Sequence, residues 1–359
     1  MRVDQLTYDL PPDRIAQFPT PEREQARLMV LGAQAEIQHR SIADLADIIP
    51  PGSLVVLNDT RVIPARLIAQ KATGGRVEIF LVRVLEHRTI EAEGRPREAH
   101  VWRALGKASK TLRFGVDMRV ASPHALFVRV LGRSDDDGLL EVALHLADTS
   151  VPLDQAIRAS GRMPLPPYIK RDVDARDTDR YQTVFAARDG AIAAPTAGLH
   201  FSEALLGRLA AHGIEVATVT LHVGLGTFQP VASADLDDHK MHAEWYEVST
   251  TAAQAIASAR ARGAKVVAVG TTVVRTLESA ADDSGEVRSI SGETTLLIQP
   301  GYRFRVVSAM LTNFHLPRST LLALVCAFGG TERVLGAYRE AVQGGYRFYS
   351  YGDAMYVQP

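Results

Sequence analysis

The hydrophobic and polar positions alternate between strand-like and helix-like patterns from about residue 151 to the C-terminus. Short apolar runs at residues 214–221 and 265–269 predict strands. Between and after these runs, apolar residues recur at helical spacing, which predicts helices on the faces of an α/β sheet. The predicted helices begin near Ser202, at Thr250 or Thr251, and near Thr272, Ser319 and Thr331.

Residues 54–57 form another apolar run, preceded by a Pro-Gly-Ser turn and followed by polar residues. A short apolar run without alternation is typical of a strand that is covered on both faces. We therefore expect this strand to join the same α/β sheet.

A different pattern separates this strand from residue 151. Short runs broken by glycines and by an aspartate cluster predict closely spaced antiparallel strands, and hence a small barrel or sandwich inserted into the α/β domain. The predicted strands are residues 77–85, 100–105, 111–114, 126–131 and 139–144.

Composition and charge narrow the class of protein. With 359 residues, of which 46% are hydrophobic and 23% charged, the chain is typical of an ordinary globular protein of two domains. Its 40 Lys and Arg residues balance 41 Asp and Glu residues, which argues against a protein that coats nucleic acid indiscriminately. Any RNA contact therefore needs a local cluster of positive charge.

The single cysteine, Cys326, lies in an apolar run, which predicts a small buried side chain and no internal disulfide. No apolar stretch approaches the roughly 18 residues that a membrane span needs, and the N-terminus already carries Arg2 and Asp4. We expect a reduced, cytoplasmic protein without a membrane segment.

Two polar motifs directly follow predicted strands, where open α/β sheets bind ligands. Asp59 and Arg61 come after the strand at residues 54–57. Thr271 and Thr272 open a helix, where N–H groups and hydroxyls are available for a carboxylate, a ribose or a phosphate. Taken alone, both motifs are better explained as ordinary turns that bind nothing.

A glycine-rich loop at residues 222–228 also follows a predicted strand. It differs from a dinucleotide-binding fingerprint, because Gln229 stands at the third glycine position and a proline comes next. The loop backbone can approach a flat ligand closely, with His222 at its mouth.

Histidines close together in a sequence can also bind a metal ion. His239, His242 and Glu244 lie within six residues of one another. The chain has neither an H-E-x-x-H motif nor a cysteine pair, so we expect no metal.

Residues 161–171 combine prolines with cations around one aromatic residue. Arg162, Lys170 and Arg171 flank Tyr168, and Arg180 follows nearby. Cations interleaved with an aromatic side chain can grip a phosphate backbone and stack an unpaired base. A linker between domains has the same composition, so both interpretations stay open at this point.

In their order along the chain, these motifs resemble one family, the S-adenosylmethionine:tRNA ribosyltransferase-isomerases of queuosine biosynthesis. The resemblance spans nearly the entire chain and departs in residues 86–150, which are longer and more charged and include an extra segment at residues 91–98. The matching segments are residues 8–11, 14–17, 57–62, 161–171, 179–185, 194–201, 222–228, 239–247, 270–272, 312–317 and 348–355.

The resemblance implies a large α/β domain with an inserted small antiparallel β-barrel domain. Residues 1–64 and 152–359 then form the large domain, and residues 65–151 form the barrel. The resemblance also implies S-adenosylmethionine as co-substrate, no metal, and a monomer that requires no protein partner. The implied substrate is a tRNA whose wobble base is 7-aminomethyl-7-deazaguanine, and the implied products are epoxyqueuosine-bearing tRNA, adenine and methionine.

In this chemistry a sulfonium acidifies the adjacent methylene, and a base with a pKa near 7 removes a proton from it. Histidine meets that need without perturbation. We predict that His200 or His222 is the base, because both lie in loops of small residues that a ligand can approach. Asp59 and Glu244 are predicted to orient a histidine or to hold ribose hydroxyls.

The remaining predicted contacts fall into two sets. The S-adenosylmethionine contacts are Arg61, Gly224, Gly226, Thr227, Thr271 and Thr272, with Arg61 and the two threonines on the methionine carboxylate. The RNA contacts are Arg162, Lys170, Arg171 and Arg180 on phosphates, Tyr168 or Phe314 stacked on an extruded base, and His315.

Two other functions remain open on the sequence. An RNA methyltransferase with the same cofactor is disfavoured, because no glycine-rich first strand-to-helix turn is followed by a suitably spaced acidic residue. The other alternative is a non-catalytic RNA-binding module. Such a module would release no free adenine when tRNA and cofactor are both present, whereas the ribosyltransferase would.

Overall fold

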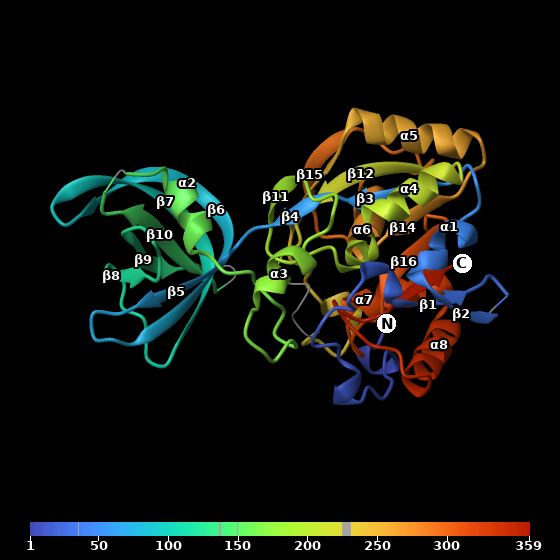
Figure 1. Cartoon of the computed structure of the whole chain (residues 1–359), viewed down its shortest axis with the longest axis horizontal. Coiled ribbons are helices and arrows are strands. Elements are labelled where there is room, and N and C mark those ends of the chain that lie inside the picture. Colours follow the sequence, from blue (N-terminus) through green and yellow to red (C-terminus); the bar gives the residue numbers. More distant parts are fainter. Residues whose placement is uncertain (35, 136–137, 149, 225–230) are drawn as a thin grey trace. The chain divides into compact units, whose positions relative to one another are not determined.

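The computed structural model describes residues 1–34, 36–135, 138–148, 150–224 and 231–359 (Figure 1). The chain forms two compact units, Met1–Arg61 with Pro166–Pro359, and Val62–Leu165. The first unit is a mixed α/β structure, so the predicted α/β class is confirmed.

A nine-stranded sheet forms the centre of the first unit, in the order β15-β13-β12-β3-β14-β16-β17-β1-β2. Its strands are β1 (Arg27–Leu31), β2 (Ile37–Ser41), β3 (Leu54–Asn58), β12 (Glu215–Leu221), β13 (Glu244–Val248), β14 (Val266–Val269), β15 (Ile290–Thr294), β16 (Ala309–Asn313) and β17 (Ala354–Val357).

The middle of this sheet is parallel. β3 pairs in parallel with both β12 and β14, and β14 pairs in parallel with β16. All five residues of β3 are buried, as expected for a strand with helices on both faces. The carboxyl ends of β12, β3, β14 and β16 therefore lie at one edge of the sheet.

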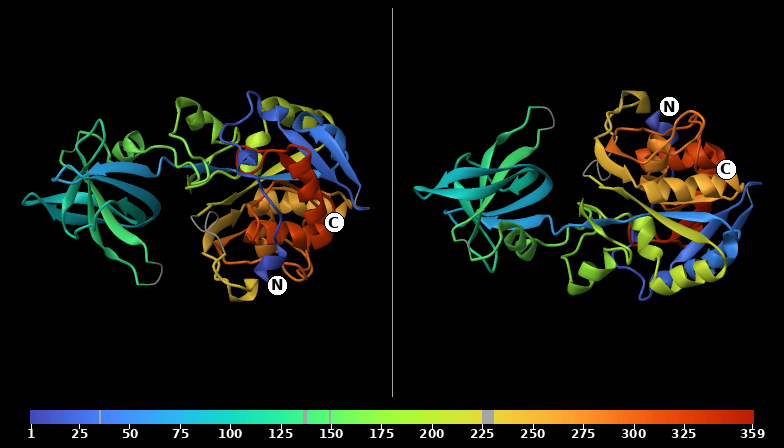
Figure 2. Two further views of the ribbon diagram at one scale, coloured as in Figure 1. Left: turned by 90° about the horizontal axis from the view of Figure 1, so that it is seen from below. Right: turned by 90° about the horizontal axis from the view of Figure 1, so that it is seen from above.

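Helices cover both faces of the sheet, as Figure 2 shows. Alternate residues of β3 point to opposite cores: Leu54 and Val56 pack with α5 to α8, whereas Val55 and Leu57 pack with α1 and α4. The helices of this unit are α1 (Leu45–Ile48), α3 (Ala175–Arg180), α4 (Glu203–Ala211), α5 (Thr250–Ala261), α6 (Thr271–Ala280), α7 (Thr320–Gly329) and α8 (Thr331–Gln343).

The helix starts follow the capping residues. Ser202, Ser249 and Ser319 each accept a hydrogen bond from the backbone N–H three residues later, and so cap α4, α5 and α7. The helix predicted at Thr250 or Thr251 begins at Thr250, one residue after its cap. Cys326, in α7, is buried as predicted.

The second unit contains six strands that close into a barrel in the order β10-β7-β6-β5-β8-β9. They are β5 (Arg66–Gln70), β6 (Arg76–Ala92), β7 (Arg95–Ala108), β8 (Asp117–Val120), β9 (Leu126–Arg133) and β10 (Leu140–Leu146), and α2 (Leu153–Ser160) follows them.

Two predictions about these strands need correction. Residues 111–114 are not a strand: they lead into a turn at Gly115, whose φ is 76°, and the strand begins two residues later as β8. The strands predicted at residues 77–85 and 100–105 are much longer, because residues 91–98 extend them into one hairpin between β6 and β7. Its turn has positive φ at both Glu93 and Gly94.

A short two-stranded sheet of β4 (Thr60–Val62) and β11 (Arg188–Ala191) lies beyond the end of β3. None of the described helices is alone long and apolar enough to span a bilayer, and only α7 and α8 taken together, bent by 115°, reach that length and composition.

Candidate active site

Four segments begin where the parallel strands end, at their common carboxyl edge. His222 comes after β12, Asp59 after β3, Thr271 after β14, and Phe314 after β16. Open α/β sheets bind ligands at this edge, because the loops there diverge and leave room between them.

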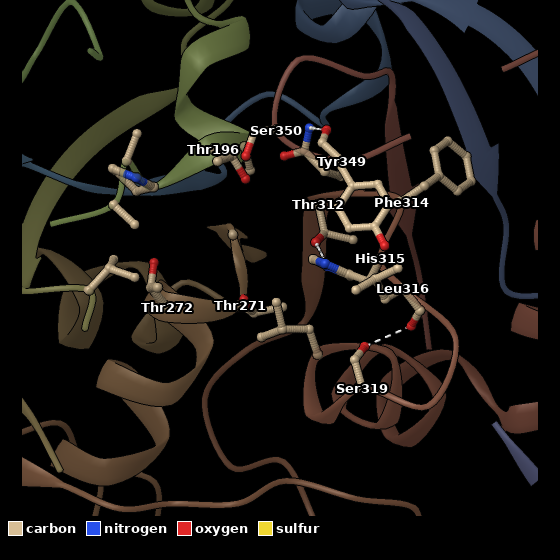
Figure 3. Close-up of a pocket in the computed structure, with 18 of the residues that line it drawn as sticks. Thr196, Thr271, Thr272, Thr312, Phe314, His315, Leu316, Ser319, Tyr349 and Ser350 are labelled. Atoms are coloured by element: carbon tan, nitrogen blue, oxygen red, sulfur yellow. Dashed lines mark hydrogen bonds between the residues drawn. The ribbon is translucent and has the colours of Figure 1, made fainter. Parts of the chain in front are cut away.

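A cavity lies at this edge, with about 760 Å³ of space between atoms, part of it open to solvent (Figure 3). The residues that line it are Tyr168, Ala193, Ala194, Pro195, Thr196, Ala197, Val223, Gly270, Thr271, Thr272, Thr312, Asn313, Phe314, His315, Leu316, Ser319, Leu321, Tyr349 and Ser350.

Asn58 joins three of the segments. Its Oδ1 accepts hydrogen bonds from the backbone N–H groups of Thr60 (3.1 Å) and Leu221 (3.0 Å). Its Nδ2 donates to the carbonyl of Leu221 (3.0 Å) and to Oγ1 of Thr272 (3.3 Å). The ends of β3 and β12 and the start of α6 are thus held together by one buried amide.

His222 is not among the residues that line the cavity, but Val223, which follows it in the sequence, is. Its Nδ1 is 2.8 Å from Oγ1 of Thr60, and its ring stacks on Trp245 with 4.9 Å between centroids. Gly190 packs against the imidazole so closely that a Cβ there would lie 2.6 Å from Nε2. Burial lowers the pKa of His222 below its ordinary value, and the charge of Asp59 opposes that shift. At neutral pH the ring is therefore a neutral imidazole.

The two candidate carboxylates have different surroundings. Asp59 accepts a hydrogen bond from Oγ1 of Thr220 at 2.7 Å. Glu244 is buried, forms an ion pair with Arg275 and accepts a hydrogen bond from the Gly224 N–H at 2.8 Å. The N–H of Gly224 is thus engaged within the protein, although it was predicted to contact the cofactor.

His200 is also buried, but its environment differs from that of His222. Its Nε2 is 3.2 Å from Nδ2 of Asn313, which lines the cavity. Burial, followed by the positive charges of Arg347, Arg23 and Arg180, lowers the pKa of His200 to about 3. This imidazole reaches the cavity only through Asn313.

The start of α6 presents both predicted threonines to the cavity (Figure 3). Gly270 precedes them with φ 95°, a conformation that a side chain would strain. Arg61 lies outside the cavity lining, where it donates to the carbonyl of Ala186 and pairs with Asp189 at 3.6 Å.

Both aromatic candidates line the cavity, but their packing differs. Tyr168 lines the cavity, with its ring centroid 4.3 Å from that of Tyr349 and its hydroxyl bonded to Ser350. Phe314 is 0% exposed, and its ring packs on Tyr338 and other core aromatics, so it offers no free face to a base.

His315 is half-buried and lines the cavity. Its Nε2 is 2.7 Å from Oγ1 of Thr312 (Figure 3). Burial lowers the pKa of His315 to about 3. It therefore reaches the cavity as a neutral side chain.

The predicted phosphate contacts are not equally available. Lys170 and Arg162 are exposed, Arg162 in the second unit. Arg171 forms a bidentate ion pair with Asp177, with both distances 2.7 Å, and Arg180 donates to the carbonyl of Pro21 at 2.6 Å.

Gly226 and Thr227, both predicted cofactor contacts, lie outside the described residues. Among the residues that the structure describes, no group of three or more His, Cys, Asp or Glu side chains is placed to hold a metal ion.

Sequence reasoning missed several residues that build this site. Asn58, Thr60 and Asn313 hold the candidate histidines and threonines in place, and Gly190 makes room for His222. The signal available for Asn58 and Asn313 was their position as the polar last residues of apolar strands. No local signal connects Gly190 to a histidine 32 positions away.

Comparison with known proteins places this site in a family. Residues 3–357 match the family described as queuosine biosynthesis protein. A protein from Sorangium cellulosum is 55% identical, with 100% of this chain and 99% of that protein covered. A protein from Pelobacter propionicus is 49% identical, with 100% of both chains covered. Both relatives are named S-adenosylmethionine:tRNA ribosyltransferase-isomerase.

A solved structure agrees with these relatives. The crystal structure of S-adenosylmethionine tRNA ribosyltransferase from Thermotoga maritima is 35% identical, with 98% of this chain and 99% of that chain covered and a TM-score of 0.54. The family match covers nearly the whole chain and includes every segment at the carboxyl edge of the sheet. The chain therefore belongs to the queuosine biosynthesis protein family.

Proposed function

We propose that this protein is an S-adenosylmethionine:tRNA ribosyltransferase-isomerase, which transfers and isomerises the ribosyl moiety of S-adenosylmethionine onto a tRNA base. The observation that carries the proposal is similarity over the full length of relatives of that name, at 49–55% identity. The accepted base is 7-aminomethyl-7-deazaguanine at the wobble position, and the products are epoxyqueuosine-bearing tRNA, adenine and methionine. The enzyme works as a cytoplasmic monomer and requires no protein partner.

The reaction begins with a proton transfer. The positive sulfur of S-adenosylmethionine acidifies the adjacent ribose methylene, and removal of a proton there gives a nucleophilic ylide carbon. The aminomethyl nitrogen of the deazaguanine bonds to the ribose carbon that adenine leaves. Rearrangement of the ribose, loss of adenine and closure to an epoxide with loss of methionine follow. These steps use side chains and the charge on sulfur, and we assign no role to a metal.

His222 is the base in this proposal. Its Nδ1 is held by Thr60, so Nε2 is the nitrogen that accepts a proton. His200 is the weaker candidate because burial holds its pKa at about 3 and Asn313 occupies its Nε2. Replacing His222 by alanine is expected to stop adenine release while S-adenosylmethionine still binds, whereas near-normal turnover of that variant would remove the assignment.

The two carboxylates support the site. Asp59 stabilises the protonated form of His222 after the transfer, since its charge already raises the pKa of that ring. Glu244 holds the turn at Gly224 by accepting its N–H, and thereby positions the residues that follow His222.

The methionine end of S-adenosylmethionine lies at the start of α6. Thr271 and Thr272 line the cavity there, and the first N–H groups of a helix favour a carboxylate. Arg61 adds long-range attraction for that carboxylate, although Asp189 already pairs with it.

The tRNA contacts are Arg162 and Lys170, which are exposed, with Arg180 beside them in the sequence. Arg171 mainly orders this segment through Asp177. Tyr168 takes the stacking role in place of Phe314, because Tyr168 is half-buried whereas Phe314 is 0% exposed and packs among core aromatics. His315 contacts the extruded base from the cavity wall.

The proposal includes the domain organisation. Residues 1–64 and 152–359 form the catalytic domain, and residues 65–151 form a β-barrel domain inserted between its strands. The closed order of β5 to β10 supports an inserted barrel, and the compact unit Val62–Leu165 extends beyond residue 151 to include α2.

Methyl-labelled S-adenosylmethionine tests the function. With undermodified tRNA, the label is expected in free methionine, together with free adenine, and only when both substrates are present. Label on the RNA without adenine would identify a methyltransferase, and neither product would identify a non-catalytic RNA-binding module.

A further inference from the structure

Asn313, in the cavity wall, carries a buried acceptor that has no partner among the described residues. The residue ends β16, lines the cavity and is 2% exposed. Its Oδ1 accepts no hydrogen bond from any of the described residues. Buried polar atoms in folded proteins nearly always have a partner, so this oxygen requires one.

Asn58 shows how the Oδ1 atom of a buried asparagine in this sheet is otherwise paired. Both are asparagines at the ends of parallel strands, β3 and β16, which flank β14 in the sheet. The Oδ1 of Asn58 accepts two backbone N–H groups, at 3.0 and 3.1 Å. The same atom of Asn313 accepts none among the described residues, although its residue is equally buried.

The orientation of the Asn313 amide follows from its neighbours. Nδ2 donates to the backbone carbonyl of Tyr349 at 3.0 Å, and a carbonyl can only accept, so this end must be the nitrogen. The second hydrogen of Nδ2 points to Nε2 of His200 at 3.2 Å, which makes His200 the acceptor and protonates its Nδ1. Oδ1 is the end that remains for a ligand.

The backbone of Tyr349, which accepts this hydrogen bond, has an unusual conformation. Its φ is 70°, a left-handed conformation that is uncommon for a residue with a side chain. It presents its carbonyl to Asn313 and its ring to the cavity (Figure 3). Uncommon conformations of this kind cluster where a ligand is held.

The surroundings select the kind of donor. Besides burial, the positive charges of Arg347, Arg23 and Arg180 act on His200, the hydrogen-bond partner of Asn313, and positive charge near Asn313 disfavours an ammonium group as its donor. Ala193, Ala194 and other small or apolar side chains line the cavity, which suits a flat aromatic ring. A neutral amine on a flat base fits both conditions.

We propose that Asn313 recognises the adenine of S-adenosylmethionine, with its Oδ1 accepting a hydrogen bond from the exocyclic amine. Within the proposed function, Asn313 is a specificity-determining residue, and His200 is a positioning residue that fixes its amide. An amide oxygen of asparagine is a common acceptor for this amine in nucleic-acid recognition.

The test compares two ligands and two proteins in a double-mutant cycle. The probes are S-adenosylmethionine and the same sulfonium compound with purine in place of adenine, which lacks the amine. The wild-type protein is expected to bind the purine compound about 2- to 13-fold more weakly, the range for one hydrogen bond. Asn313→Ala should bind the two ligands equally, whereas Thr196→Val, at another position of the cavity lining, should keep the preference.

Every outcome decides the inference. Equal binding by the wild-type protein, or a preference that persists in Asn313→Ala, overturns it. If Asn313→Ala fails to fold, the wild-type comparison decides, together with a third ligand that lacks the methionine ammonium. A selective loss for that third ligand, with no loss for the purine compound, assigns the donor to the ammonium and overturns the adenine assignment. If the wild-type protein binds none of these ligands, the proposed function fails as well, which separates the two failures.

Discussion

Gly190 and His222 show how closely backbone and imidazole approach each other at the site. Gly190 has φ 151°, and a Cβ at this position would lie 2.6 Å from Nε2 of His222. Gly190→Ala should displace the imidazole and lower kcat about 10- to 100-fold, because displacements near 1 Å have effects of this size. Adenine release under saturating substrates measures the effect.

Gly207→Ala is the matched control for this change. Gly207 lies in α4, and a Cβ there would meet no atom within 4 Å. Alanine favours a helix, so this variant should keep full activity and gain up to about 1 kcal/mol of stability. Equal activity of both variants would show that the contact between Gly190 and His222 does not matter for catalysis.

His200 makes stability depend on pH. Its pKa is about 3 in the folded protein, against roughly 6.5 in the unfolded chain. The unfolded state therefore binds the extra proton first, so the contribution is present above pH 6.5 and is lost as the pH falls toward 3. Between pH 7 and pH 5 this loss is about 2 kcal/mol.

His200→Gln should remove that part of the pH dependence, since a glutamine oxygen can still accept from Asn313 and does not titrate. Urea unfolding at pH 7 and pH 5 measures the difference between this variant and the wild-type protein. An unchanged pH dependence in His200→Gln would contradict the burial of a neutral imidazole.

At this scale the sequence identified much of the site but not its connections. Four predicted contacts line the cavity: Thr271, Thr272, Tyr168 and His315. Three of them lie close to strand ends, and Tyr168 lies in the proline-rich segment. Asn313 lay within a recognised motif and received no role. Its importance comes from partners 36 and 113 positions away, which no local pattern reveals.

Among the elements, α7 connects stability to the cavity through its cap. Ser319 accepts from the Leu322 N–H at 3.1 Å and also lines the cavity. Ser319→Ala should cost about 1 kcal/mol of the free energy of unfolding, the usual value for a lost cap. It should also weaken S-adenosylmethionine binding a few-fold, because the start of α7 then frays.

Ser249 caps α5 with nearly the same geometry, 3.2 Å to the Ala252 N–H, and is not among the lining residues. Ser249→Ala should therefore lose similar stability without weaker binding. Denaturant unfolding and calorimetric titration measure the two effects separately. Identical binding by both variants would argue that the start of α7 does not touch the ligand.

Elements with strong local signals were predicted well. α4, α5 and α7 begin directly after their serine caps, and α8 begins at the predicted Thr331. The strand predicted at residues 111–114 failed because Phe114 points outward, 56% exposed, ahead of a glycine turn. An apolar residue in a short run does not by itself indicate burial.

For the whole molecule, tRNA binding should respond to salt through exposed cations. Replacing Arg162 and Lys170 by alanine should flatten the slope of log affinity against log salt by about 0.7 to 0.9 for each lost phosphate contact. Arg40→Ala, at an exposed position of β2, is the control and should leave the slope unchanged. A wild-type slope in the double variant would exclude both residues as phosphate contacts.

The α/β class was predictable, because strand-like and helix-like hydrophobic patterns alternate along the sequence. The strand order was not. β17 is the last strand of the chain, yet it pairs antiparallel with β16 and parallel with β1. Pairing between residues more than 300 positions apart depends on tertiary packing, which local sequence does not encode.

The central claim is that His222 removes a proton from the ribose methylene next to sulfur. A crystal structure with S-adenosylmethionine in the cavity measures this most directly. The account predicts that the methylene lies within about 3 to 3.5 Å of Nε2 of His222, the separation of reacting atoms. A ligand whose ribose lies away from the turn that carries His222 would contradict it.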